Sequence, residues 1–83
     1  MPVIQPLRDD LQKYLTAHGL NKKWQKARQL FTENPWHPSL HTEILEPKHN
    51  LIYSLRLDKK YRALFLVLKD GTIEIIKITN HYR

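Results

Sequence analysis

The sequence contains no cysteine, which excludes disulfide bonds and catalysis by a thiolate. It also lacks any apolar run near the ~20 residues that span a bilayer, and no signal-peptide core follows Met1. Internal repeats, low-complexity tracts and linkers are absent as well. These absences predict one compact domain over residues 1–83, with no membrane association and a cytoplasmic location.

The charge balance is the first positive signal. Fourteen Lys and Arg against eight Asp and Glu give a formal net charge of +6. On so small a body this charge favours polyanionic partners, meaning nucleic acid, an acidic protein or a membrane surface. A basic domain with scattered lysines is the alternative, because net charge bears on association and not on fold.

The first half of the chain has the apolar spacing of amphipathic helices. One helix is predicted over about 7–18, where Gly19 supplies the left-handed residue that ends it. A second is predicted over about 22–33, starting after Asn21 and stopped by Asn34-Pro35. The short connection between them predicts an antiparallel helical hairpin.

After residue 50 the apolar period becomes two, which predicts three strands, at about 51–57, 61–69 and 72–79. Asp70-Gly71 is typical of a two-residue type I′ turn, which would set Lys69 opposite Thr72. The predicted fold is therefore α+β, with the helical hairpin packed on one face of a small, three- to four-stranded antiparallel sheet.

The loop at 58–60 fixes which side chains share a face of that sheet. Three loop residues pair Arg56 with Arg62 and separate apolar from charged positions, whereas a two-residue loop would slip the register by one. Cationic and apolar side chains then share the face turned away from the helices; they are Arg56, Arg62, Lys77, Leu64, Leu66, Leu68, Ile73 and Ile75. We expect a partner segment to cover the apolar part.

Two arginines directly opposed across a ladder repel each other by a few tenths of a kcal/mol. Guanidinium groups pair bidentately with phosphate oxygens, so Arg56, Arg62 and Lys77 suggest a phosphate site. His81 joins them if the last strand continues past Thr79. A solvated sheet face with arginines pointing apart is the other interpretation, and the pattern leaves both open.

Residues 35–50 hold three prolines and three histidines, which predicts an ordered loop with a short strand or turn around 42–45. His37 and His41 have a metal-ligand spacing for a helix, but Pro38 lies between them and no third ligand is apparent. We therefore predict no metal and no cofactor. Prolines at both ends of residues 2–6 argue against a full strand there.

Three short motifs resemble the RelE/ParE toxin superfamily of type II toxin–antitoxin systems. They are Pro38-Ser39-Leu40-His41, the strand pair from Arg56 to Arg62, and the terminal His81-Tyr82. The resemblance covers essentially the whole chain and is greatest to the ribosome-dependent mRNA endonucleases of the YoeB-like branch. In those proteins an acidic residue stands ten positions before the aromatic residue of the next strand, which here gives Glu43 before Tyr53.

This resemblance implies a toxin that cleaves mRNA in the ribosomal A site without a metal. It makes Glu43 the general base, Arg62 the main phosphate-binding arginine, His81 the general acid and Tyr82 the residue that orients a nucleotide, with Arg56 in support. The implied partners are an antitoxin, the ribosome and mRNA. Further RNA contacts are expected from the remaining cations of the basic face and terminus: Lys59, Lys60, Lys77 and Arg83.

Two other functions fit the same fold. One is a ParE-like poison of DNA gyrase, and the other is an inactive basic module that binds RNA or protein. The pair His81-Tyr82 together with Arg62 favours the nuclease, because gyrase poisoning needs no general acid at this place.

Overall fold

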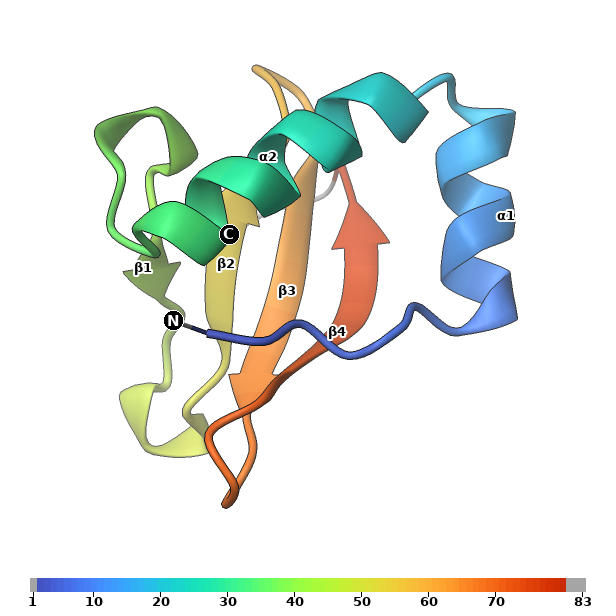
Figure 1. Ribbon diagram of the computed structural model, residues 1–83. Helices are drawn as coiled ribbons and strands as arrows, with labels where there is room; N and C mark the ends of the chain where they lie inside the picture. The colour runs from blue at the N-terminus through green and yellow to red at the C-terminus, as the bar shows by residue number, and fades with distance from the viewer. Residues whose placement is uncertain (1, 81–83) are drawn as a thin grey trace.

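The structure, a computed structural model, describes residues 2–80. Two α-helices precede a four-stranded antiparallel sheet of order β1-β2-β3-β4 (Figure 1). The elements are α1 (Asp9–Ala17), α2 (Asn21–Glu33), β1 (Glu43–Ile44), β2 (Tyr53–Arg56), β3 (Arg62–Val67) and β4 (Ile73–Thr79), with short 3₁₀ turns η1 (Pro38–Leu40) and η2 (Lys48–Asn50). The predicted α+β class is confirmed, and β1 is the short strand expected around 42–45.

The helices occupy one side of the sheet. In Figure 1, α2 lies across the strands and α1 stands beside β4, while the N-terminal segment crosses in front of the sheet to reach α1. That segment is tied to β4 by two hydrogen bonds, from Gln5 N to Ile73 O and from Ile73 N to Val3 O, both 2.8 Å. It thus forms a single parallel bridge, at Ile4, and not a full strand.

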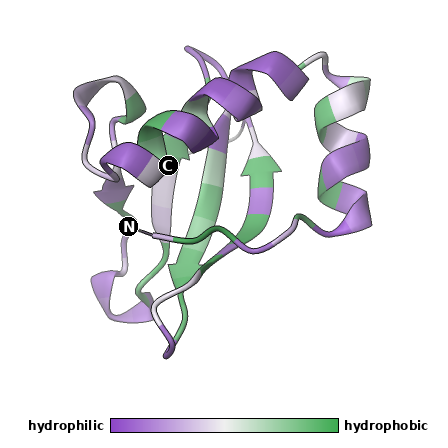
Figure 2. Cartoon of the chain, in the orientation of Figure 1, coloured by the Kyte–Doolittle hydropathy of each residue, from purple (hydrophilic) through white to green (hydrophobic). Residues whose placement is uncertain are grey.

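Apolar side chains of both helices and the sheet form the core. Figure 2 shows α2 hydrophilic on its outer side, whereas β3 and β4 are mostly hydrophobic. Phe31 of α2 meets Phe65 of β3 edge to face at 5.1 Å between ring centroids. The buried apolar residues are Ile4, Leu11, Leu15, Leu20, Trp24, Ala27, Phe31, Leu40, Leu55, Ala63, Phe65, Ile73, Ile75 and Ile78. The opposite face of the sheet carries polar and charged groups together with the half-buried Leu64, Leu66 and Leu68.

The register predicted for the β2–β3 hairpin is confirmed. Arg56 pairs with Arg62, and Leu57 N donates to Tyr61 O across a three-residue loop. The Asp58 carboxylate accepts hydrogen bonds from the backbone N–H groups of Lys60 and Tyr61, at 2.8 and 2.7 Å. These bonds hold the loop and thereby fix which side chains of β2 and β3 share a face.

The loop length predicted at Asp70-Gly71 is wrong. Leu68 N donates to Thr72 O, so three residues and not two form the loop, and Val67 pairs with Ile73. Gly71 has φ +87°, the left-handed conformation that completes a type I turn in a three-residue hairpin. Asp-Gly suits this loop as well as the two-residue turn, so the dipeptide alone does not decide the register.

A β-bulge then restores the predicted register further along the hairpin. Leu64 pairs with Lys77 but Phe65 pairs with Ile75, which leaves Ile76 as the extra residue. Its carbonyl accepts a hydrogen bond from Arg8 Nη2 at 3.1 Å. The shift turns Ile73 and Ile75 into the core, where they are 4% and 3% exposed. They therefore do not belong to the outward apolar stretch predicted from the sequence, of which Leu64, Leu66 and Leu68 remain, each half-buried.

Candidate functional site

Arg62 is fixed on the sheet face that the helices leave uncovered. Its Nε and Nη2 donate to the Ser54 hydroxyl at 3.0 and 2.7 Å, and Nη2 also donates to the carbonyl of His41 at 2.7 Å. Ser54 is fully buried, and His41 has a left-handed backbone with φ +46°. The guanidinium is thus oriented by β2 and by the residue that ends η1.

The environment of this guanidinium favours an anionic ligand. Burial lowers the pKa of Arg62, the neighbouring Arg56 lowers it too, and Glu43 acts in the opposite direction. A guanidinium stays protonated in proteins, so the cost of burying it persists as an unfavourable interaction. A phosphate oxygen bound beside Arg62 would add an attractive charge-assisted contact at this pair of arginines.

Glu43 and Arg56 flank Arg62 on the same face. Glu43 lies opposite Ser54 in the β1–β2 ladder, and Arg56 lies opposite Arg62 in the β2–β3 ladder. Arg56 Nε donates to the carbonyl of Asp58 at 3.1 Å, so the two arginines have different partners despite facing each other. Within residues 2–80 the exposed Glu43 carboxylate forms no ion pair. It is therefore available to accept a proton or a hydrogen bond.

A cleft of about 400 Å³ opens beside the two arginines, here called the sheet cleft. It is lined by His41, Arg56, Asp58, Lys59, Lys60, Arg62 and Asn80. Asp58 is the one acidic group among its described lining residues, and Lys23 Nζ neutralises that carboxylate at 2.7 Å. Burial alone would raise the pKa of Asp58, but hydrogen bonds from Lys23 and from backbone N–H groups outweigh it and lower the pKa. The cleft is therefore strongly cationic.

Comparison with known proteins supports a fold assignment. No family model matches the sequence, and no curated protein matches it significantly. Among solved structures, the YoeB/ParE toxin from Agrobacterium tumefaciens has a TM-score of 0.71 at 17% identity, covering 99% of this chain and 100% of that one. The YoeB dimer from Staphylococcus aureus has a TM-score of 0.64 at 21% identity, covering 96% and 94%. The fold is that of the YoeB and ParE toxins.

Within this toxin fold, the predicted site residues divide into three groups. Arg56, Arg62, Lys59 and Lys60 line the sheet cleft, and Glu43 lies beside Arg62 on the same sheet face without lining the cleft. Lys77 shares the sheet face, opposite Leu64, but does not line the cleft. The predicted roles of His81, Tyr82 and Arg83 concern positions outside the described residues. Asn80, the last described residue, lines the cleft.

Sequence reasoning missed two residues of the site. Ser54 holds Arg62 through its hydroxyl, yet a serine within a strand has no distinguishing pattern. Its one signal was positional, because the predicted register already placed it on the face of Arg56 and Arg62. His41 was noted only for a motif and a metal spacing, whereas its carbonyl binds Arg62 and its side chain lines the cleft.

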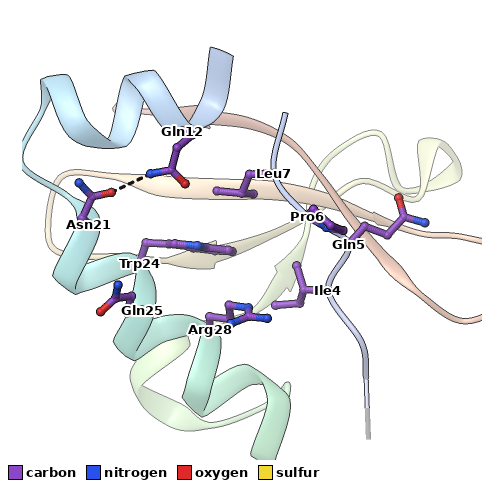
Figure 3. A pocket seen from close by; sticks show the side chains of 9 residues that line it. All are labelled: Ile4, Gln5, Pro6, Leu7, Gln12, Asn21, Trp24, Gln25 and Arg28. Carbon is purple, nitrogen blue, oxygen red and sulfur yellow. Dashed lines mark hydrogen bonds between the residues drawn. The ribbon is translucent and has the colours of Figure 1, made fainter. Parts of the chain in front are cut away.

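A second cavity of about 350 Å³ lies between the N-terminal segment and the two helices (Figure 3). Trp24 and Leu7 form apolar walls, and Gln12 donates to Asn21 at 3.0 Å. Of the described residues that line it, Arg28 alone is charged, so they offer no acid–base pair. The sheet cleft is therefore the better candidate for chemistry.

Between residues 2 and 80, no three His, Asp or Glu side chains come close enough together to bind a metal ion. No helix in that range is long and apolar enough to cross a membrane.

Proposed function

We propose that the protein is the toxin of a type II toxin–antitoxin pair and cleaves mRNA on the ribosome. The observation that carries this proposal is the anchored Arg62 beside Arg56 at a cationic cleft, with Glu43 on the same face of the sheet. The YoeB/ParE-like fold supports it, because the structural relative from Agrobacterium tumefaciens is named as a YoeB/ParE toxin and the one from Staphylococcus aureus as a YoeB dimer. The proposed partners are an antitoxin protein, the ribosome and mRNA.

The proposed reaction is attack of a ribose 2′-hydroxyl on the adjacent phosphorus. Glu43 takes the proton of the 2′-hydroxyl, and the new P–O2′ bond forms as the P–O5′ bond breaks. His81, which follows Asn80 in the sequence, gives a proton to the leaving 5′-oxygen. The products are a 2′,3′-cyclic phosphate and a 5′-hydroxyl, and the 2′-hydroxyl requirement limits the substrate to RNA.

Arg62 and Arg56 act on the phosphate during this step. Negative charge grows on the non-bridging oxygens in the transition state, where a preoriented guanidinium binds more strongly than in the ground state. Tyr82 orients the nucleotide, and Lys59, Lys60, Lys77 and Arg83 hold neighbouring phosphates.

A translation extract tests the proposal. Wild-type protein should cut ribosome-bound mRNA, and Arg62→Ala, His81→Gln and Glu43→Gln should each slow single-turnover cleavage by roughly 10²–10⁴-fold. Arg28→Ala, which removes an arginine from the other cavity, is the matched control and should cut normally. Thermal melts show whether each variant is folded.

Near-normal cleavage by both the Arg62 and the His81 variants would refute this mechanism. Gyrase-dependent DNA breaks from wild-type protein, without mRNA cleavage, would instead assign the ParE-like activity. If wild-type protein cleaves neither mRNA nor DNA, the inactive basic binding module is the remaining interpretation.

A further inference from the structure

Another cleft, of about 260 Å³ and distinct from the cavity in Figure 3, lies between α2, η1 and the end of β2. It is here called the helix cleft. Its floor is apolar, from Ala27, Leu30, Leu40 and Leu57. Its rim carries Lys23, Lys26 and Arg56, and no carboxylate from residues 2–80 lines it. Within that range no aromatic ring lines it either, so these residues offer no platform on which a base could stack.

The helix cleft continues the sheet cleft, because Arg56 lines both. From Arg62, cationic side chains therefore follow one another past Arg56 and the 58–60 loop to α2. Asp58 lies at the junction, but its carboxylate is engaged by Lys23 and by two backbone N–H groups. Lys26 forms no ion pair with any residue in the described range.

We propose that the helix cleft binds the phosphodiester backbone of the RNA strand whose scissile phosphate lies at Arg62, an inference that rests on the proposed function. The strand passes Arg56 and places a further phosphate beside Lys26 at the α2 rim. A nucleic-acid strand suits this path because it presents one negative charge per nucleotide along a flexible chain. The contact is to phosphate alone, so it is independent of base sequence.

Binding of a 2′-O-methyl oligouridylate tests the assignment, because this single strand has no 2′-hydroxyl to be cleaved. Fluorescence anisotropy gives its Kd as a function of salt for wild type, Lys26→Glu and Arg28→Glu. Arg28 is the matched control, since it also lies on α2 but lines neither cleft and is not one turn away from Lys26. Lys26→Glu should weaken binding about fivefold or more and lower the salt slope by about 0.7, the value for one phosphate contact on a single strand.

Three results would overturn the assignment. Equal affinities and slopes for the Arg28 and Lys26 variants would remove the helix cleft from the RNA path. Absence of wild-type binding at low salt would do the same. Polyglutamate that competes as well as the oligonucleotide, with the same dependence on Lys26, would assign the cleft to an acidic protein segment.

Cleavage by wild-type protein in the translation extract separates this inference from the proposed function. If wild type cuts mRNA while Lys26→Glu binds RNA normally, the helix cleft inference alone fails. If wild type does not cut while Lys26→Glu still weakens RNA binding, the nuclease assignment fails and the RNA path stands.

Discussion

Replacing Ser54 with alanine is expected to disorder the guanidinium of Arg62 without removing its charge. The Ser54 hydroxyl accepts from both Nε and Nη2, and it is fully buried between β1 and β3. After the substitution Arg62 keeps its bond to the carbonyl of His41 at 2.7 Å but loses the contact that sets the plane of the guanidinium. Ser54 is therefore a positioning residue that acts on the substrate through Arg62.

The expected magnitude follows from the type of hydrogen bond. Bonds to charged groups contribute about 1.5–3 kcal/mol, and solvent access to the half-buried Arg62 reduces this to about 1–2 kcal/mol of unfolding free energy. For a chain of this size that lowers Tm by roughly 5–10 °C. If the same interaction orients Arg62 in the transition state, cleavage slows by about 5- to 30-fold.

The assay pairs single-turnover cleavage in the translation extract with thermal denaturation. Ser54→Ala should lower the rate at saturating ribosomes more than it weakens ribosome binding, because an oriented guanidinium contributes most in the transition state. Ile73→Val is the control for stability alone, since Ile73 is buried at the far end of the sheet and its truncation costs about 0.5–1.5 kcal/mol. It should leave cleavage unchanged.

A double-mutant cycle on stability gives the decisive comparison. Ser54→Ala should cost less in an Arg62→Ala background than in wild type, with a coupling energy of about 0.5–2 kcal/mol. Additive losses from the two substitutions would show that the Ser54 hydroxyl does not act through Arg62. A rate for Ser54→Ala equal to that of Ile73→Val would refute the positioning role.

Two further predictions concern stability. Asp58 has a lowered pKa when folded, so it stabilises the protein above its unfolded pKa of about 3.9, and this stabilisation is lost as the pH falls through the lower folded value. Asp58→Asn should therefore cost about 0.5–1 kcal/mol at pH 7 and progressively less below pH 4, as urea denaturation at several pH values would measure, and a constant difference would contradict this. Gly71→Ala should cost about 1 kcal/mol in thermal denaturation because of its φ of +87°, although no atom lies within 4 Å of the added Cβ, and an unchanged Tm would contradict the argument from backbone strain.

The two hairpins show which parts of the fold a sequence can determine. In the β2–β3 hairpin, only one register separates apolar from charged side chains, and Asp58 is placed to cap the matching loop. In the β3–β4 hairpin, Asp-Gly suits two loop lengths, and adjacent Ile75 and Ile76 hide the position of the bulge. The one sequence signal of this bulge was Glu74, which a register without the bulge would place among core residues.

The candidate site, like the fold, could be predicted only in part from the sequence. Register alone brought Arg56 opposite Arg62, and the family resemblance supplied Glu43. The contacts that orient Arg62 could not be predicted, because one comes from a backbone carbonyl of the loop between η1 and β1. Carbonyl positions depend on local backbone geometry, here the left-handed conformation of His41, which side-chain patterns do not encode.

The site residues also stabilise the fold, and this affects how their variants are to be interpreted. Ser54 is fully buried on the sheet face that no helix covers, and the guanidinium of Arg62 is hydrogen-bonded directly to its hydroxyl. Arg62→Ala therefore removes a phosphate ligand and also deprives a buried hydroxyl of its donor, which costs about 1–3 kcal/mol in similar cases. In a chain of 83 residues that is a large share of the total stability. Loss of cleavage by Arg62→Ala is thus evidence for a catalytic role only at temperatures well below the Tm of that variant.

Glu43→Gln does not have this difficulty, because the carboxylate of Glu43 is exposed and has no ion pair within residues 2–80. Its effect on the rate is accordingly the cleaner measure of chemistry at this face.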